Sequence, residues 1–322
     1  MKKTLSLLVV LVLVLVLASA VSVAESSQNL PLAGKKILVS TYFLEDDFCI
    51  EMNYTIVDRL KELGAEVSLT NSNSDGEVQT RQIEAHLESG IDFMFLMPPS
   101  LDVLVPVIEK AADMGVKTIL YDAGANTTKG VITHVSVNDR LEGNTLGEYL
   151  VDYIGKELGG KAMILFESAM EIERFQIRIE GVKEILDANK DLDVSYAYLD
   201  SKGLREVAAN VTANYSAPYD IIIGAEMNTS WGAISTLEAQ NAKGVKVFSI
   251  ADWSKEGFEA IRDDHEYYLS FCTVYPGLIG STAVDSLLAY LAGEKVEPVT
   301  YIQTPMVSKE NMNDFWDFEK YK

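Results

Sequence analysis

The sequence predicts an α/β protein built on parallel sheets and divided into two similar halves. Short apolar runs, typical of buried parallel strands, alternate with segments whose apolar residues recur every three or four positions, as on the buried face of a helix. In addition, Gly115–Lys117 leads into a run that ends at Asp122, and Gly244–Lys246 leads into a run that ends at Asp252. The second half therefore repeats a feature of the first.

Six apolar runs are expected to be strands of these sheets. Each is short and lacks the apolar–polar alternation of a strand with one solvated face, so both of its faces should be buried under helices. A further strand is expected at His134–Asn138. The six runs are Lys36–Ser40, Phe93–Met97, Thr118–Tyr121, Ala162–Phe166, Ile221–Ile223 and Val245–Ile250.

Segments with helical spacing lie between the first of these strands. Each is followed by a glycine, which can adopt the left-handed conformation that commonly ends a helix. They are Ile56–Leu63 before Gly64, Ile83–Leu87 before Gly90, and Leu104–Ala111 before Gly115.

Composition limits the classes of partner. The 322 residues include 27 Lys and Arg against 48 Asp and Glu, for a net charge of −21. A chain this acidic, with no long basic run, is repelled by phosphate backbones, so we expect no nucleic-acid partner. Its length suggests two domains or one large α/β unit. The two cysteines exclude both a disulfide-rich scaffold and a structural zinc site built on cysteines.

The first 24 residues are predicted to be a secretory signal peptide. Lys2 and Lys3 form a basic start, and Leu7–Ala18 is an unbroken apolar run. Small residues then offer cleavage sites, and we expect cleavage after Ala24, followed by a polar tether at 25–34. The alternative is an uncleaved anchor, but the run is shorter than the roughly 20 residues that a spanning helix needs.

No later stretch is apolar enough to span a membrane, so the mature chain is expected to be soluble and exported. The first cysteine, Cys49, lies far from the cleavage site, so no lipid-modified cysteine is expected there. We therefore expect a periplasmic location. Export permits a disulfide, but Cys49 and Cys272 are expected to be free thiols; a bridge between them is the alternative.

Motifs for catalysis are missing from the sequence. It contains no GxGxxG, GxxxxGK[ST], GxSxG or HExxH pattern, and His86, His134 and His265 are far apart. We therefore expect no catalytic residues, no metal and no cofactor. Since carboxylates alone can act as acid and base, an exported α/β enzyme remains an alternative.

Asp122 and Asp252 are the first candidates for ligand binding. Each follows a predicted strand at its carboxyl end, where open α/β sheets bind ligands. Either could instead be a helix N-cap. Their matching places in the two halves favour a shared ligand, and their place at strand ends, outside the core, predicts that the fold survives their replacement.

Several segments, in this order, resemble the type I periplasmic binding proteins, specifically the ribose-binding-like branch. The likeness covers roughly residues 35–310. Asp46–Cys49 stand where that branch often has Asn-Pro-Phe-Phe. The other matching segments are Gln82–Glu84 with Gly90–Asp92, Met97–Ser100, Asp122, Ser136–Asn138 with Gly143, Glu180–Gly181 and Trp231–Ala233.

This resemblance implies two Rossmann-like lobes with parallel sheets joined by a three-stranded hinge. The chain would cross near Asn138, near Thr273–Val274 and near Pro298–Gln303. Lobe one would be 35–138 plus 274–298, and lobe two 139–273 plus 299–322. The resemblance further implies a monomer that captures a small polar ligand between its lobes, closes on it, and delivers it to a membrane ABC permease. A sensor that reports to a membrane receptor is an alternative.

The resemblance also implies a set of ligand-binding residues. Phe48 would stack on a sugar ring, and carboxylates would accept hydroxyl hydrogen bonds. Trp253 is a further aromatic candidate, whereas Trp231 is expected to pack on its own helix. The implied contacts are Asp46, Asp47, Phe48, Asp122, Gln176, Glu226, Asp252 and Tyr275.

The implied site departs from the family in its charge. Gln176 and Ala123 stand where the family often has arginine, and Asp47 and Glu226 add acid. Five carboxylates in one site are costly unless hydroxyls, water or a cation compensate them. A sugar or polyol is the expected ligand, and a cationic metabolite, an amino sugar or a nucleoside is the alternative.

Overall fold

The computed structural model describes residues 30–316, which fold as two compact units. Unit 1 comprises 30–135 and 277–300, and unit 2 comprises 136–276 and 301–316, so the chain passes from one unit to the other three times. The predicted signal peptide at 1–24 lies outside the described residues, as does most of the predicted tether. Within 30–316, no helix has both the length and the apolar character needed to cross a membrane.

Unit 1 is built on a six-stranded sheet with the strand order β11-β5-β4-β3-β1-β2. The strands from β5 to β2 in this order pair in parallel. Its elements are β1 (Lys36–Thr41), α2 (Asp47–Glu62), β2 (Glu66–Asn71), α3 (Gly76–Glu88), β3 (Phe93–Met97), α4 (Val105–Asp113), β4 (Lys117–Tyr121), β5 (Val131–Val137), α10 (Pro276–Leu291) and β11 (Val299–Ile302).

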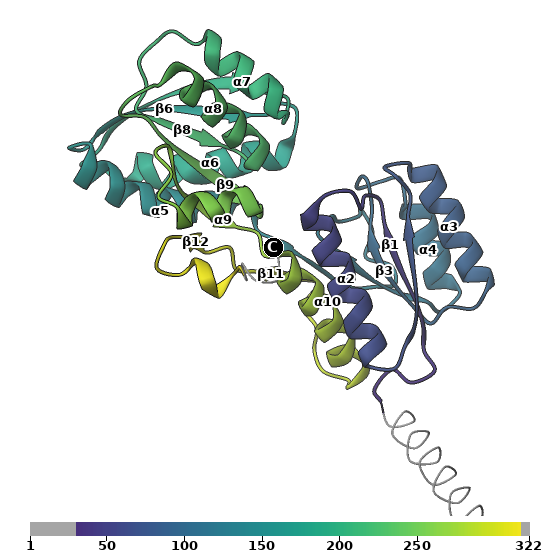
Figure 1. Ribbon diagram of the computed structural model, residues 1–322. Coiled ribbons are helices and arrows are strands. Elements are labelled where there is room, and N and C mark those ends of the chain that lie inside the picture. Colours follow the sequence, from purple (N-terminus) through teal and green to yellow (C-terminus); the bar gives the residue numbers. More distant parts are fainter. Residues whose placement is uncertain (1–29, 317–322) are drawn as a thin grey trace, which may run out of the picture. The chain divides into compact units, whose positions relative to one another are not determined.

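Helices cover both faces of this sheet. Leu38 of β1 and Met94 of β3 pack with α3 and α4 in one buried cluster. On the other face, α10 lies against α2 (Figure 1), where a Cβ at Gly280 would stand 2.7 Å from the carbonyl oxygen of Met52. A helix that follows the first segment of unit 2 in the sequence thus completes the core of unit 1.

Unit 2 repeats the architecture with the strand order β12-β10-β9-β8-β6-β7. Its pairings are parallel except that of the short β12 with β10, which is antiparallel. Its elements are α5 (Asp139–Glu157), β6 (Lys161–Ser168), α6 (Glu173–Ala188), β7 (Asp193–Asp200), α7 (Arg205–Asn214), β8 (Ile221–Gly224), α8 (Met227–Gln240), β9 (Lys246–Asp252), α9 (Lys255–Arg262), β10 (Tyr268–Thr273), β12 (Met306–Val307) and the 3₁₀ helix η1 (Met312–Asp314).

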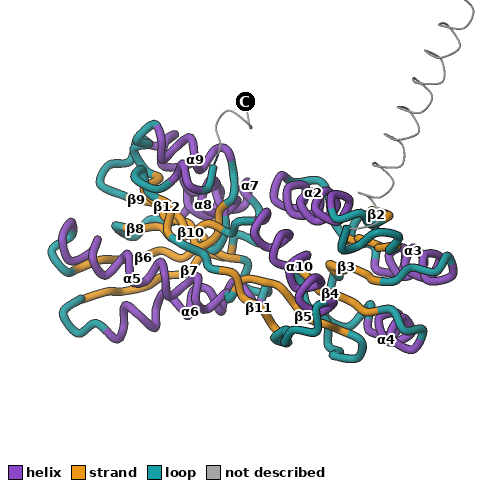
Figure 2. The backbone as a smooth tube through the Cα atoms, turned by 90° about the horizontal axis from the view of Figure 1, so that it is seen from below, coloured by secondary structure: helices purple, strands orange, loops and turns teal. Residues whose placement is uncertain are grey.

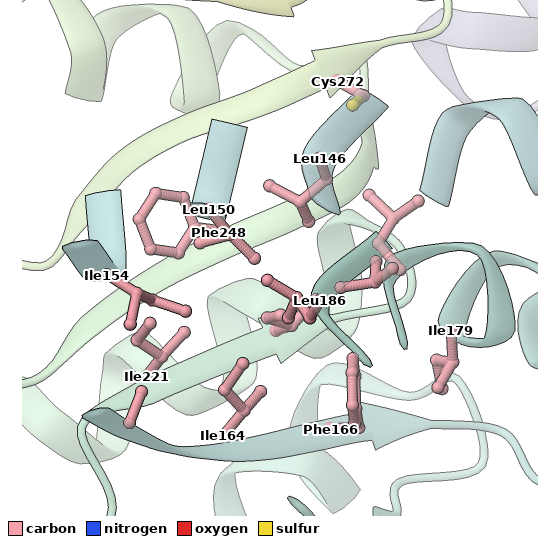
Figure 3. Packing of buried hydrophobic residues seen from close by; sticks show 14 residues of the cluster. Leu146, Leu150, Ile154, Ile164, Phe166, Ile179, Leu186, Ile221, Phe248 and Cys272 are labelled. Carbon is pink, nitrogen blue, oxygen red and sulfur yellow. The ribbon is translucent and has the colours of Figure 1, made fainter. Parts of the chain in front are cut away.

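A cluster of buried aliphatic and aromatic side chains holds α5 and α6 on the sheet of unit 2. Leu146 and Leu150 of α5 and Leu186 of α6 pack against Phe166 and Phe248 of the sheet (Figure 3). The two helices also approach each other closely, and a Cβ at Gly143 would stand 2.0 Å from the carbonyl oxygen of Arg178.

The predicted α/β class with parallel sheets is confirmed. The six predicted apolar runs fall in strands, except for Val245, which precedes β9. The helical segments fall in α2, α3 and α4, except for Leu63 and Leu104, which are cap residues of α2 and α4. The strand predicted at His134–Asn138 begins earlier, at Val131. Helices and strands alternate along most of each unit (Figure 2).

The sequence analysis missed the edge strands β2 and β7. Both lie at the end of their sheet order, and neither has a fully buried residue. A strand at the edge of a sheet is only partly covered, so it has no continuous apolar run to reveal it.

Candidate functional site

Asp122 follows β4 at the carboxyl edge of the unit 1 sheet, in an unusual backbone conformation. Its φ of 55° lies in the left-handed region, which costs a residue with a side chain about 1 kcal/mol or more. Strand β5 holds it there, because Asp122 N donates to the carbonyl oxygen of Val135 at 2.8 Å. The His134 ring Nε2 lies 3.0 Å from the carbonyl oxygen of Asp122. Such strain, over-determined by neighbours, is typical of functional positions.

The loop after β1 brings three further predicted residues to the same edge. Asp46 caps α2, and its Oδ1 accepts a hydrogen bond from Cys49 N at 2.6 Å. Asp47 is exposed in the first turn, and Phe48 is half-buried. Burial raises the pKa of the Cys49 thiol, and the carboxyls of Asp46 and Asp122 raise it further. Asp46 and Asp122 therefore lie around the same point of unit 1.

A buried polar chain behind this edge escaped the sequence analysis. The Tyr121 hydroxyl donates to Asn53 Oδ1 at 2.7 Å, and Asn53 Nδ2 donates to the carbonyl oxygen of Cys49 at 2.8 Å. Tyr121 and Asn53 are both fully buried, and burial raises the pKa of Tyr121 well above its usual value. The chain ties the end of β4 to the first turn of α2. Asn53 has no signal in the sequence, because its role depends on the strand beside it.

In unit 2, Gln176 and Glu226 follow the ends of β6 and β8. Gln176 Nε2 donates to Ser168 Oγ at 3.3 Å and to the carbonyl oxygen of Ala169 at 3.2 Å. Glu226 is the N-cap of α8, and its carboxylate accepts hydrogen bonds from the backbone N–H groups of Asn228 at 2.8 Å and Thr229 at 3.0 Å. Burial raises the pKa of Glu226, while these bonds lower it.

Asp252 ends β9 and is only 1% exposed. The Tyr268 hydroxyl donates to its Oδ2 at 2.5 Å, and the Ser254 hydroxyl donates to its Oδ1 at 2.7 Å. Burial raises the pKa of Asp252 to about 7, and the nearby Glu226 carboxylate adds to the shift. The expectation that Asp252 lies outside the core is therefore wrong. A strand end that tertiary packing covers is as buried as the strand itself.

The predicted aromatic residues of unit 2 form a stack. Trp253 lies parallel to Tyr275, with ring centroids 4.9 Å apart, and meets Phe258 and Trp316 edge-on. Trp253 is buried and Tyr275 is half-buried. Trp231 is buried as well, with its ring centroid 5.0 Å from that of Tyr268. Of these rings, Tyr275 has the accessible surface that a ligand contact requires.

The carboxylates of the candidate site are largely compensated within each unit. Asp46 and Glu226 accept backbone N–H bonds at helix N-termini, where the helix dipole also favours negative charge. Asp252 accepts two hydroxyl bonds.

Cys49 and Cys272 are both buried, free thiols. Among residues 30–316, no group of His, Cys, Asp and Glu is placed to hold a metal ion.

Comparison with known proteins places this architecture. The family model described as periplasmic binding protein domain matches residues 37–295. The chain belongs to this periplasmic binding protein family. In unit 1, the family match covers the whole sheet except β11 and Lys36, the first residue of β1. In unit 2, it covers every element from α5 to β10.

Two relatives and one solved structure illustrate the similarity. This periplasmic binding protein is 24% identical to the D-xylose-binding periplasmic protein of Escherichia coli over 64% of its length and 63% of that protein. It is 23% identical to a ribose import binding protein of Bacillus subtilis, over 80% of its length and 82% of that protein. The crystal structure of a periplasmic ribose ABC transporter from Conexibacter woesei has the same fold, with a TM-score of 0.77 and 18% identity over 88% of this chain and 94% of that one.

Proposed function

We propose that this periplasmic binding protein captures a neutral sugar or polyol and delivers it to an ABC permease. The observation that carries the proposal is the state of the acidic side chains at the carboxyl edges of the two sheets. They supply the oxygen acceptors that hydroxyl groups need, and most of their charge is already compensated. The ligand names of the relatives, xylose and ribose, support the same class of ligand.

Charge compensation separates a neutral ligand from a cationic one. Carboxylates that lack donors of their own would favour a ligand ammonium group, because an unpaired charge in a buried site is costly. Here Asp46, Glu226 and Asp252 each accept hydrogen bonds from their own unit. A carboxylate keeps further lone pairs after one or two such bonds, so it can still accept from a hydroxyl. A cationic metabolite therefore has less to gain at this site than the sequence alone suggests.

The proposed ligand contacts come from both units. We propose that Asp46, Asp47, Phe48 and Asp122 of unit 1, with Gln176, Glu226 and Tyr275 of unit 2, contact the ligand. Asp252, which is 1% exposed, would support this edge of the sheet from within rather than touch the ligand. Phe48 and Tyr275 supply aromatic faces for the C–H groups of a sugar ring. Gln176 supplies an amide oxygen, because its Nε2 is engaged within unit 2. No catalytic step is assigned, so the ligand should be recovered unchanged after incubation.

A thermal-shift screen tests the proposed function. The four test ligands are D-ribose, D-xylose, xylitol and myo-inositol, and the cationic comparison compounds are glucosamine and putrescine. A ligand that binds only the folded state raises the melting temperature by mass action, about 2.7 kcal/mol of stability at 100 times its Kd. We expect a saturable shift from at least one neutral compound. A shift from the cationic compounds alone, or turnover of any bound compound, would reject the proposal.

We further propose that the mature protein is exported to the periplasm as a monomer. The support is the basic and apolar start of the sequence and the family to which the chain belongs. Protein secreted by an exporting host should begin near Glu25 on N-terminal sequencing and elute as a monomer from a calibrated sizing column. An intact Met1 in the membrane fraction would contradict the export proposal.

A further inference from the structure

Arg178 joins three elements of unit 2 and is itself nearly inaccessible. It lies on α6 and is 4% exposed. Its Nε donates to Asp139 Oδ1 on α5 at 2.8 Å and lies 2.8 Å from Glu142 Oε2 on the same helix. Its Nη1 donates to the carbonyl oxygen of Ala225, in the loop between β8 and α8, at 3.1 Å. One guanidinium therefore holds two helices and a loop together.

The packing of α5 on α6 makes this arrangement specific. Glycines at the helix contact allow the close approach: a Cβ at Gly181 would stand 2.4 Å from the carbonyl oxygen of Arg140. Arg178 is thereby placed within reach of both Asp139 and Glu142 of α5. A planar guanidinium can serve several acceptors in fixed directions, whereas a lysine ammonium is a single point charge.

The loop that Arg178 holds carries a candidate ligand residue. Ala225 precedes Glu226, and its peptide is held from both sides, because Ala225 N donates to the carbonyl oxygen of Glu167 at 2.9 Å while its own carbonyl accepts from Arg178. The charge of Arg178 also lowers the pKa of Glu226. Arg178 therefore acts on Glu226 through both the backbone and the electric field, without lying at the surface.

The acids that Arg178 contacts lie near the start of α5, the first helix after the chain passes from unit 1 to unit 2. Asp139 begins α5, directly after Asn138, which caps that helix and follows β5. The chain passes from unit 1 to unit 2 within β5, at Val135 and Ser136. Arg178 thus connects the segment where the chain enters unit 2 to the loop that carries Glu226.

We propose that Arg178 is a positioning residue for ligand binding: it fixes the Ala225–Glu226 loop relative to the start of α5 without touching the ligand. The inference rests on the proposed function, because it assumes that Glu226 contacts the ligand. Its removal should weaken binding by displacing Glu226 and should loosen the loop even when no ligand is present.

A pair of arginine variants tests this role. Arg178→Lys keeps the positive charge beside Glu142 but cannot reach Asp139 and the Ala225 carbonyl together. The matched control is Arg140→Gln. Arg140 also joins α5 to α6, through exposed ion pairs with Glu180 at 2.9 Å and Glu184 at 3.1 Å, and neither pair involves the loop. Each variant is titrated calorimetrically with D-ribose, D-xylose, xylitol and myo-inositol, well below its melting temperature.

We expect Arg178→Lys to raise the Kd of whichever of these compounds binds the wild type by about tenfold, equivalent to about 1.4 kcal/mol. Arg140→Gln should leave it within about twofold, since exposed ion pairs contribute little. Amide hydrogen exchange of the free protein supplies a second readout. Exchange at 225–227 should rise in Arg178→Lys and stay unchanged in Arg140→Gln, whereas a merely structural role would raise exchange throughout α5 and α6.

The outcomes separate the inference from the proposed function. An unchanged Kd in Arg178→Lys, or an equal loss in Arg140→Gln, would overturn the positioning role. If the wild type binds none of the four compounds, the proposed function fails, and unchanged exchange at 225–227 would separately overturn the role of Arg178. Should Arg178→Lys fail to fold, Asp139→Asn weakens one arm of the contact, and a Kd equal to that of the wild type would again overturn it.

Discussion

Asp122 and Asp252 occupy matching places in the two units but are held in opposite ways. In unit 1, the backbone of Asp122 is constrained, in a left-handed conformation bonded to β5, while its side chain is half-exposed. In unit 2, the backbone of Asp252 continues a strand, and its buried carboxyl is held by Tyr268 and Ser254. The comparison shows that a repeated sequence feature can place an acid at the same point of two units while the fold restrains different parts of it. In one unit it restrains the backbone, and in the other the side chain.

The largest difference between the two should appear in stability. Asp252→Ala removes the acceptor of two hydroxyl groups, those of Tyr268 and Ser254, and Tyr268 is fully buried. The substitution should destabilise the protein by about 2–4 kcal/mol, because each buried donor left unpaired costs about 1–3 kcal/mol. Asp122→Ala should cost less than half as much. Urea unfolding followed by circular dichroism measures both. Equal losses would show that the two acids are restrained alike.

The next effect is on affinity and applies to Asp122, the more accessible member of the pair. Asp122→Ala should weaken binding of the sugar or polyol by about 1.5–3 kcal/mol, the range for a hydrogen bond to a charged group. The fold should survive, because the carboxyl is not part of the core. Calorimetry with the compound identified by thermal shift measures the loss. A wild-type Kd in this variant would remove Asp122 from the site.

Unit 2 should also respond to pH through buried carboxyls. Burial raises the pKa of Glu167 to about 8. Its Oε1 accepts a hydrogen bond from the Thr212 hydroxyl, which lowers the pKa and offsets part of the effect of burial. The folded state therefore retains a proton that the unfolded chain releases above its ordinary pKa of about 4.3.

Stability should accordingly fall as pH rises from about 4.3 towards 8 and then level off, because the folded state binds more protons in this window. Glu167→Gln keeps the shape and the hydrogen-bonding capacity but cannot ionise. Its stability relative to the wild type should increase by up to about 4 kcal/mol between pH 5 and pH 8.5. Thermal unfolding across this range measures the difference, with the exposed Glu157→Gln as control. A constant offset between variant and wild type would contradict a protonated Glu167.

The smallest effect isolates the backbone of Asp122. Glycine adopts a φ of 55° without strain, whereas alanine does not. Asp122→Gly should therefore be more stable than Asp122→Ala by about 1 kcal/mol, although both lose the same side chain and should bind ligand equally poorly. Equilibrium unfolding of the two variants side by side measures this. Identical stabilities would mean that the left-handed conformation is not retained in the folded protein.

The sequence by itself determined the α/β class, most of the buried strands and the repeated acids at the ends of two of them, but it missed the buried strand β10. These features are local: a strand covered on both faces must be apolar throughout, and a helix must repeat its apolar residues with its own period. The order of short segments from Asp46 to Trp231 also indicated the family, which the match of the family model to residues 37–295 confirms. None of this required knowing which element packs beside which.

Only the tertiary structure decided what the candidate side chains are bonded to. Glu226 serves as an N-cap because α8 begins directly after it, and Asp252 is buried because Tyr268 of a neighbouring strand reaches it. Arg178 gained its role from Asp139 and Ala225, which lie 39 and 47 residues away in the sequence. Asn53 gained its role from Tyr121, which lies 68 residues away. Hydrogen-bond partners are chosen by distance in space, which a pattern along the chain does not record. The edge strands β2 and β7 escaped for the same reason, since their exposure follows from their place in the sheet.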